Sequence, residues 1–394
     1  MLQRIRGNYA HTIYASYLGY ITQAIVNNFA PLLFLTFVED FGLTLDQVTL
    51  ITTLNFAVQL CVDLLSARVV DRVGYRACIL AAHLFSAAGV VGLAVLPAAM
   101  GGYAGVLTAV MLYAVGGGLI EVLVSPIVEA CPTEKKEAAM SLLHSFYCWG
   151  HVGVVLLSTA FFATFGVRNW RILACLWALI PLLNVFYYAQ VPIYPIAAGR
   201  EKLSIGALCR QKVFWVLLVM MVCSGASEQG MSQWASAFAE SGLRVEKAVG
   251  DLAGPCAFAL LMGSSRAIYG RFSDRLPLRA AMMGSAGLCV VCYLLASLTG
   301  SALLSLVGCA LCGFSVGIFW PGTFSLAAQA LPGGGTAMYA LMALAGDLGC
   351  SSGPTLVGLV ANAANGQLTT GLLAAIVFPM VMIAVLVAFG KMKR

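Results

Sequence analysis

Apolar residues fill long blocks of this chain instead of alternating with polar ones, as they would in a half-buried strand. Each block has the roughly 20 residues that an α-helix needs to cross a hydrocarbon core about 30 Å thick. We therefore expect an all-α membrane protein with twelve transmembrane helices and no extramembrane domain of useful size. The predicted helices are 9–38, 47–70, 77–96, 103–130, 138–165, 170–189, 213–239, 248–269, 280–298, 302–331, 335–361 and 368–389.

The composition agrees with a membrane protein. Of the 394 residues, 61% are hydrophobic and 10% are charged, whereas soluble domains carry about 25% charged residues. The first apolar block follows basic residues, but it is too long for a signal peptide and has no small-residue cleavage site, so we expect a retained helix. The 13 cysteines lie mostly inside apolar blocks without paired spacing, and we interpret them as buried small apolar residues.

Basic residues are distributed unequally between the two sides of the predicted topology. Eighteen of the 22 Lys and Arg, Arg266 among them, fall on the side that holds both termini, and the other four are Arg168, Arg171, Arg244 and Lys247. Cytoplasmic loops carry the excess of basic residues, so we expect cytoplasmic termini and a place in the inner membrane. The net charge of +6 follows from this topology, and the expected partner is the lipid bilayer rather than nucleic acid.

The longest polar interruption divides the chain into two halves. We expect an N-terminal six-helix bundle over 1–190, a cytoplasmic linker over 191–212 and a C-terminal six-helix bundle over 213–394. A loop motif of the form small-x-x-x-Asp-Arg-x-x-x-Arg occurs in both halves. Its copies, 203 positions apart, contain Ala67, Asp71, Arg72, Gly74 and Arg76 in the first half and Gly270, Asp274, Arg275 and Arg279 in the second. The pairs Gly118 with Pro126 and Gly313 with Pro321 repeat in the same way.

This loop motif resembles the cytoplasmic-loop signature of the major facilitator superfamily. The resemblance implies a 6+6 helix fold that binds its substrate between the halves. A small residue at position 67 or 270 allows two helices to approach closely. Asp71 or Asp274 can accept from a helix N-terminus or pair with an arginine, so we expect a cytoplasmic latch. The alternative is that the basic residues only anchor lipid headgroups.

Ionisable side chains inside a bilayer cost roughly 2.5–3.5 kcal/mol, so they normally face a cavity and serve a function. None of the candidate carboxylates falls on the third, sixth, ninth or twelfth helix, which support the fold from outside in the resembled family. Two of them, Asp63 and Glu129, lie close to the cytoplasmic loops and are expected at the gate. The full set is Asp63, Glu121, Glu129, Glu228 and Asp347, with His144 and His151.

Glu121 and His144 form the predicted proton-coupling pair. They lie at equal distances from the turn that joins the fourth and fifth helices, so an antiparallel hairpin would bring them to one depth. A carboxyl group in hydrocarbon beside a titratable imidazole can carry a proton. The alternative is a structural hydrogen-bonded pair. Tyr147 and His151 follow His144 at i+3 and i+7 on one helix face, and we place them in the substrate site.

Polar side chains of the first, seventh, tenth and eleventh helices complete the predicted substrate site. Amides, carboxylates and indoles supply the donors, acceptors and stacking surfaces that sugar hydroxyls and ring faces need. The alternative for the two indoles is an interfacial anchor. The residues are Gln23, Asn27, Asn28, Glu228, Gln229, Gln233, Trp234, Trp320 and Asp347.

Short stretches narrow the resemblance to the fucose:proton symporter branch of the superfamily. They are Asn27 and Asn28, Glu121, the run 125–132 and the run 143–146. The resemblance implies that Glu121 is the proton-linked glutamate of the fourth helix. The aspartate that the branch carries on its first helix has no counterpart, because Phe29, Ala30 and Pro31 follow Asn28.

The expected function is secondary active transport. No P-loop, nucleotide fingerprint, metal cluster or nucleophile elbow appears, so we expect no enzyme and no cofactor other than the coupling proton. We expect a monomer that carries a sugar or similar small polar solute by proton symport. The alternatives are a proton-driven exporter of drugs or metabolites, which would favour a more apolar cavity, and an uncoupled facilitator, which would leave Glu121 unexplained.

Overall fold

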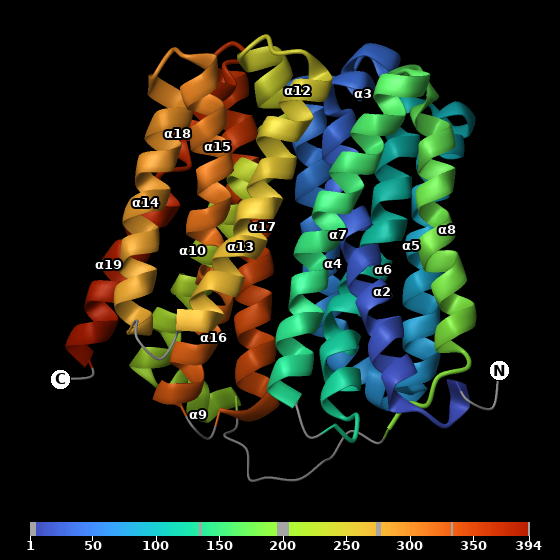
Figure 1. Cartoon of the computed structure of the whole chain (residues 1–394), viewed down its shortest axis with the longest axis vertical. Coiled ribbons are helices and arrows are strands. Elements are labelled where there is room, and N and C mark those ends of the chain that lie inside the picture. Colours follow the sequence, from blue (N-terminus) through green and yellow to red (C-terminus); the bar gives the residue numbers. More distant parts are fainter. Residues whose placement is uncertain (1–4, 134–135, 195–204, 273–276, 332–333, 393–394) are drawn as a thin grey trace. The chain divides into compact units, whose positions relative to one another are not determined.

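The protein consists of two compact helical units, Met1–Gly199 and Arg200–Arg394. The structure, a computed structural model, describes residues 5–133, 136–194, 205–272, 277–331 and 334–392. The described residues form helices and turns, without a strand. Within each unit the long helices run side by side (Figure 1). The division between Gly199 and Arg200 falls inside the segment 191–212 that the sequence predicts as the linker.

The first unit contains six long helical segments. The first of them is broken after Asn28, because Pro31 has no N–H with which to continue the helix. The elements are α2 Tyr9–Asn28, η1 Ala30–Leu33, α3 Phe34–Phe41, α4 Leu45–Val73, α5 Tyr75–Met100, α6 Gly102–Glu129, α7 Lys136–Phe165, η2 Val167–Asn169 and α8 Trp170–Tyr188.

The second unit repeats this plan with more interruptions. Its first, second, fourth and sixth long segments are each divided into shorter elements, whereas the sequence predicts continuous helices there. The elements are α9 Ile205–Cys209, α10 Lys212–Ser232, α11 Ala235–Ala237, η3 Phe238–Gly242, α12 Lys247–Asp251, η4 Leu252–Cys256, α13 Ala257–Phe272, α14 Leu278–Leu298, α15 Ala302–Val316, α16 Phe319–Ala330, α17 Gly335–Ala363, α18 Leu368–Ala374 and α19 Val377–Met392.

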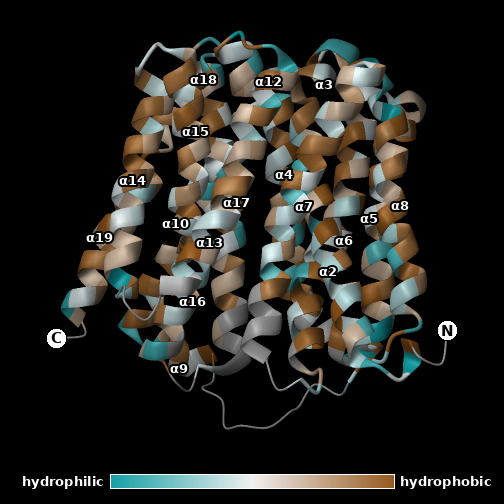
Figure 2. Ribbon diagram, in the orientation of Figure 1, coloured by the Kyte–Doolittle hydropathy of each residue, from teal (hydrophilic) through white to brown (hydrophobic). Residues whose placement is uncertain are grey.

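Eleven segments of the described residues are long and apolar enough to cross a membrane. Hydrophobic residues line most of the helix length (Figure 2). The predicted eleventh helix, 335–361, is α17, which has 29 residues but is not among the eleven. Asp347, Ser351 and Ser352 lie in its middle and lower its hydropathy. The chain is a multi-pass membrane protein, and its twelfth crossing stays a prediction.

The helices of the two units pack in the same order. In the first unit α2 contacts α6, α7 and α8, α6 also packs on α4 and α5, and α5 packs on α8. In the second unit α10 contacts α15, α17 and α19, α15 also packs on α13 and α14, and α14 packs on α19. Numbered one to six within each unit, the packed pairs are the same. This shared order supports the internal repeat that the loop motifs indicate.

Candidate functional site: two intramembrane polar networks

Glycines of α6 allow two neighbouring helices to approach it closely. A Cβ atom at Gly117 would lie 3.0 Å from Oε1 of Gln23 on α2. A Cβ atom at Gly118 would lie 3.0 Å from Cα of Gln59 on α4. Small residues permit such contacts between membrane helices. The two glycines therefore bring α2 and α4 against the turn of α6 that precedes Glu121.

A chain of hydrogen-bonded amides connects these helices to Glu121. Nε2 of Gln23 donates to Oε1 of Gln59 at 2.9 Å and to Oε2 of Glu121 at 3.1 Å. Nε2 of Gln59 donates to Oδ1 of Asn27 at 2.9 Å and to Oδ1 of Asn55 at 3.1 Å. Nδ2 of Asn55 donates to Oδ1 of Asn27 at 3.1 Å. We call Gln23, Asn27, Asn55 and Gln59, all buried, the amide network.

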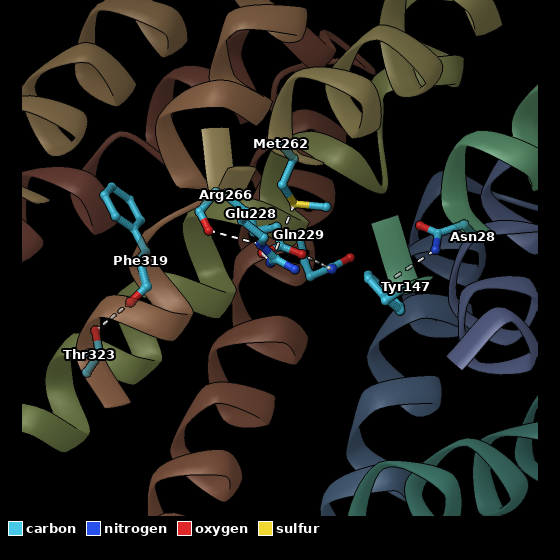
Figure 3. Close-up of polar contacts among 9 residues, drawn as sticks. Asn28, Tyr147, Glu228, Gln229, Met262, Arg266, Phe319 and Thr323 are labelled. Atoms are coloured by element: carbon cyan, nitrogen blue, oxygen red, sulfur yellow. Dashed lines mark hydrogen bonds and ion pairs between the residues drawn. The ribbon is translucent and has the colours of Figure 1, made fainter. Parts of the chain in front are cut away.

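Aromatic side chains extend this region towards α7. Nδ2 of Asn28 donates to the hydroxyl of Tyr147 at 3.4 Å (Figure 3). The hydroxyl of Tyr20 shares a 3.1 Å hydrogen bond with Ser125, one turn after Glu121 on α6. The ring of Tyr20 also lies 5.2 Å from the ring of His144. Tyr20 therefore contacts both helices of the predicted proton-coupling pair.

The histidines of α7 lie in different surroundings. His144 is exposed, whereas His151 is buried. Both lie on the helix that packs against α2, where a Cβ atom at Gly150 would come 2.9 Å from Ala24. The pairing of Glu121 with His144 stays a prediction.

In the second unit, α10 carries a comparable polar network. Nε2 of Gln229 donates to Oε1 of Glu228 at 3.2 Å, and Nε2 of Gln233 donates to Oε1 of Gln229 at 2.9 Å. These three side chains are buried. Nη2 of Arg266 on α13 lies 4.0 Å from Oε2 of Glu228 (Figure 3). Because α10 and α13 are the first and second segments of their unit, this network occupies the repeat positions of α2 and α4.

Arg266 belongs to this network, because it contacts both Glu228 and a neighbouring helix break. Its Nε donates to the carbonyl of Gly317 at 3.0 Å. That carbonyl lies four residues before Pro321, whose ring nitrogen has no hydrogen to donate to it. Pro321 thus leaves the carbonyl of Gly317 without its usual helical donor at the break between α15 and α16. The guanidinium of Arg266 donates to this carbonyl instead. A hydrogen bond and an ion pair therefore hold the charge of Arg266 between helices, and its assignment to the cytoplasmic side stays a prediction.

The predicted tryptophans and Asp347 lie where α10, α16 and α17 pack together. The indole N–H of buried Trp234 donates to the carbonyl of Pro354 at 3.0 Å, which ties the end of α10 to α17. The ring of Trp320 lies directly against Gly346, where a Cβ atom would overlap it. Asp347, the next residue, is 2% exposed. The interactions of Trp234 and Trp320 thus include contacts that hold the second unit together.

Two arginines of the loop motif, Arg76 and Arg279, lie against the end of the sixth helical segment of their own unit. Gly74 has φ +93°, a conformation that favours glycine, and it ends α4 and begins α5. The guanidinium of Arg76 then donates to carbonyls at the end of α8. In the second unit, the guanidinium of Arg279 lies against Gly390 near the end of α19. The acceptors of Arg76 are Tyr188 at 2.8 Å, Ala189 at 3.1 Å and Val191 at 2.8 Å.

The latch itself stays a prediction. Arg72 is exposed in the last turn of α4, and Asp63 lies four residues after Gln59 on the same helix. The side chains of Asp71 and Glu129, the surroundings of Gly270, and the whole of Asp274 and Arg275 fall outside what the structure describes.

Sequence reasoning missed several buried polar residues. On the second helix it singled out the ionisable Asp63 and overlooked Asn55 and Gln59, although an amide pair at i, i+4 in an apolar block is a visible signal. It also passed over Asp251, which is 1% exposed and accepts from Ser236 at 2.5 Å. Nζ of Lys247 lies 3.3 Å from Asp251.

The side chains of these networks are mainly hydrogen-bond donors and acceptors. Among the residues that the structure describes, no group of three His, Cys, Asp or Glu side chains is arranged to hold a metal. Amides, carboxylates and a guanidinium instead offer donors and acceptors that can exchange partners with a polar solute or a proton.

Comparison with known proteins identifies the family. The sequence profile of the Major Facilitator Superfamily matches residues 16–354. No curated protein matches the chain in sequence. A bacterial homologue of the human lysosomal transporter Spinster has a similar structure, with a TM-score of 0.76 and 13% identity over 97% of each chain.

Two sugar symporters are also similar in structure. The E. coli fucose:proton symporter FucP has a TM-score of 0.66 and 16% identity, over 97% of this chain and 98% of its own. A D-xylose–proton symporter has a TM-score of 0.74 and 12% identity over 96% of each chain. At these identities the likeness shows the fold alone. The profile match covers most of the chain and confirms the predicted superfamily: this protein belongs to the Major Facilitator Superfamily, whose transporters carry small solutes across a membrane.

Proposed function

We propose that the protein is a secondary active transporter of the cytoplasmic membrane that carries a sugar or similar small polar solute by proton symport and alternating access. The observation that carries this proposal is the amide network ending on Glu121. Fucose and D-xylose are the solutes named for two proton symporters of similar fold, which supports a sugar as the first solute class to test.

The geometry around Glu121 suits a proton site. Gln23 donates to Glu121, and Oε1 of Gln23 is buried without a partner among the described residues. If Glu121 takes up a proton, its new O–H can donate to this oxygen after the amide of Gln23 turns over. Both protonation states therefore find a hydrogen-bond partner on α2, so the half-buried Glu121 can gain or lose a proton without losing its partner there.

The energy available from one proton is adequate for accumulation. Moving one charge through 100 mV releases about 2.3 kcal/mol, and a tenfold concentration ratio costs about 1.4 kcal/mol. One coupled proton can therefore sustain accumulation of tens-fold.

The test is uptake of labelled fucose, D-xylose and related hexoses into proteoliposomes, with and without a pH gradient. We expect Glu121→Gln to abolish uphill accumulation and to preserve exchange of solute across the membrane, because the neutral amide resembles the protonated carboxyl group but can neither take up nor release a proton. The matched control is Glu39→Gln, which neutralises an exposed carboxylate on α3. Proton-driven accumulation by Glu121→Gln at the rate of the unmodified protein would contradict the proposal.

The same assay separates the two alternatives. An uncoupled facilitator would equilibrate the solute but never accumulate it, whatever the pH gradient. A proton-driven exporter would move its solute against the direction of the proton. In either case the proposal of symport fails, although the membership of the superfamily stands.

A further inference from the structure

Four buried cysteines face one another across α14 and α15. The sequence contains Cys289-Val-Val-Cys292 and Cys309-Ala-Leu-Cys312, so the interpretation that the cysteines lack paired spacing is wrong. All four side chains are 0% exposed, and all four are free thiols. Sγ of Cys289 lies 3.9 Å from Sγ of Cys312. We call these residues the cysteine cluster.

The register of the antiparallel helix pair produces this arrangement. Near the turn, the hydroxyls of Thr299 and Ser305 share a 3.2 Å hydrogen bond. Farther along, a Cβ atom at Gly308 would lie 2.8 Å from the carbonyl oxygen of Cys292. Residues three apart share a helix face, so the same register places Cys289 opposite Cys312 and the other two cysteines opposite each other.

The surroundings of the cluster are uncharged and rich in sulfur. Sγ of Cys309 lies 3.3 Å from Sδ of Met231 on α10. Thiols and disulfides are both uncharged, so oxidation would bury no charge here. A metal bound by thiolates would bring charge into the same apolar surroundings, which is costly. The chemistry of this place therefore favours a disulfide over a metal.

We propose that Cys289 and Cys312 are a redox-active dithiol that a small uncharged two-electron oxidant, such as hydrogen peroxide or molecular iodine, converts to an intramolecular disulfide. Two S–H bonds break and one S–S bond forms. Peroxide takes up the two electrons and two protons and becomes two water molecules, whereas iodine becomes two molecules of hydrogen iodide. The sulfurs must approach by roughly 2 Å to reach the length of a disulfide, so α14 and α15 shift at this level.

The shift would reach the polar network of α10. Met231 contacts the cluster, and the hydroxyl of Tyr293, next to Cys292, donates to the carbonyl of Ser227 at 2.9 Å. Ser227 precedes Glu228. The cysteine cluster thus contacts the part of α10 that carries the Glu228 network. The oxidation state of the cluster sets the spacing of α14 and α15, which pack against this part of α10.

The test is peptide mapping of the full-length protein in lipid nanodiscs. Reduced protein is treated with molecular iodine, denatured, labelled with N-ethylmaleimide, digested and analysed by mass spectrometry. We expect a linked pair of peptides containing Cys289 and Cys312, which dithiothreitol separates. The link should disappear in Cys289→Ala and in Cys312→Ala. It should persist in Cys223→Ala, which removes a buried thiol of α10 outside the cluster.

Oxidation of the exposed Cys61 in the same sample shows that the iodine has acted. If Cys289 and Cys312 are then still fully labelled by maleimide, the proposal is overturned. A link from either residue to a different cysteine would overturn it as well. If an alanine variant does not fold, as judged by gel filtration, the corresponding serine variant gives the same readout. The measurement does not depend on the transported solute, so its outcome is separate from that of the transport assay.

Discussion

At the scale of single residues, the polar side chains inside this protein are stabilised by one another. An isolated buried charge is very costly, whereas a paired and hydrogen-bonded one is tolerated. Glu121 accepts from the amide network, and Glu228 has both an amide and a guanidinium beside it. Exposed fractions of 20% for Arg266 and 11% for Glu228 keep their charges mostly out of water. The free-energy cost of burying each charge of this pair therefore depends on the presence of the other charge.

This dependence predicts a non-additive response to substitution. Arg266→Met leaves Glu228 without its counter-charge and should lower stability by about 3–5 kcal/mol, the usual cost of breaking a buried pair. The double variant Arg266→Met, Glu228→Gln removes both charges and should recover a large part of that loss. Thermal unfolding of the two single variants and the double variant in detergent gives the coupling energy.

The control for this cycle pairs Glu228→Gln with Arg210→Met, because Arg210 is exposed near the start of the second unit. The effects of those two substitutions on the free energy of unfolding should be additive. If the Arg266 and Glu228 substitutions were equally additive, the ion pair would not stabilise the unit.

At the scale of helices, glycine positions decide which pairs pack closely. A Cβ atom at Gly349 of α17 would overlap the backbone of α10 and would lie 2.9 Å from the amide nitrogen of Ala226. Gly353 and Gly225 lie in the same interface, each against backbone atoms of the facing helix. The helix α17 can therefore pack its backbone against α10, next to the Glu228 network. Lipid tails are as apolar as side chains, so close contact is a main source of association between membrane helices.

We predict opposite effects for two glycine substitutions in this unit. Gly349→Ala should destabilise it by about 1–3 kcal/mol, because backbone atoms cannot move aside as a flexible side chain can. The matched control is Gly284→Ala in α14, where a Cβ atom would meet nothing within 4 Å. Alanine should be neutral or stabilising there by up to about 1 kcal/mol, since it favours helix more than glycine does. Thermal unfolding measures both, and equal effects would contradict the close packing of α10 and α17.

At the scale of the whole molecule, the number of crossings decides where the termini lie. In the first unit the chain returns to its starting side: the hydroxyl of Thr12 donates to the carbonyl of Pro192 at 2.6 Å, and Nδ1 of His11 lies 2.7 Å from the hydroxyl of Tyr187. That unit therefore crosses an even number of times. Whether the second unit does so depends on α17, the long helix that is not among the eleven apolar segments.

We predict that α17 crosses the membrane and that both termini are cytoplasmic. Epitope tags at the two ends should resist external protease in right-side-out vesicles and be removed in inverted ones. A tag inserted next to Gly166, in the predicted outer turn after α7, is the control. It should be removed in right-side-out vesicles and be protected in inverted ones. Tags that respond in opposite ways at the N- and C-termini would mean an odd number of crossings.

The sequence by itself determined the helical membrane class, the approximate span positions, the repeat and the superfamily, because these follow from hydropathy and from residues adjacent along the chain. It also placed Gln23, Asn27, Glu121, Glu228 and Gln229 among the important polar residues, since each interrupts an apolar block. Only the tertiary structure decided their partners. Arg266 meets Glu228, and Cys289 meets Cys312, through the packing of helices whose residues are distant in sequence. Hydropathy records how apolar a segment is. Contacts depend instead on how each helix is rotated about its axis, on where glycine allows two helices to approach closely, and on where proline breaks a helix.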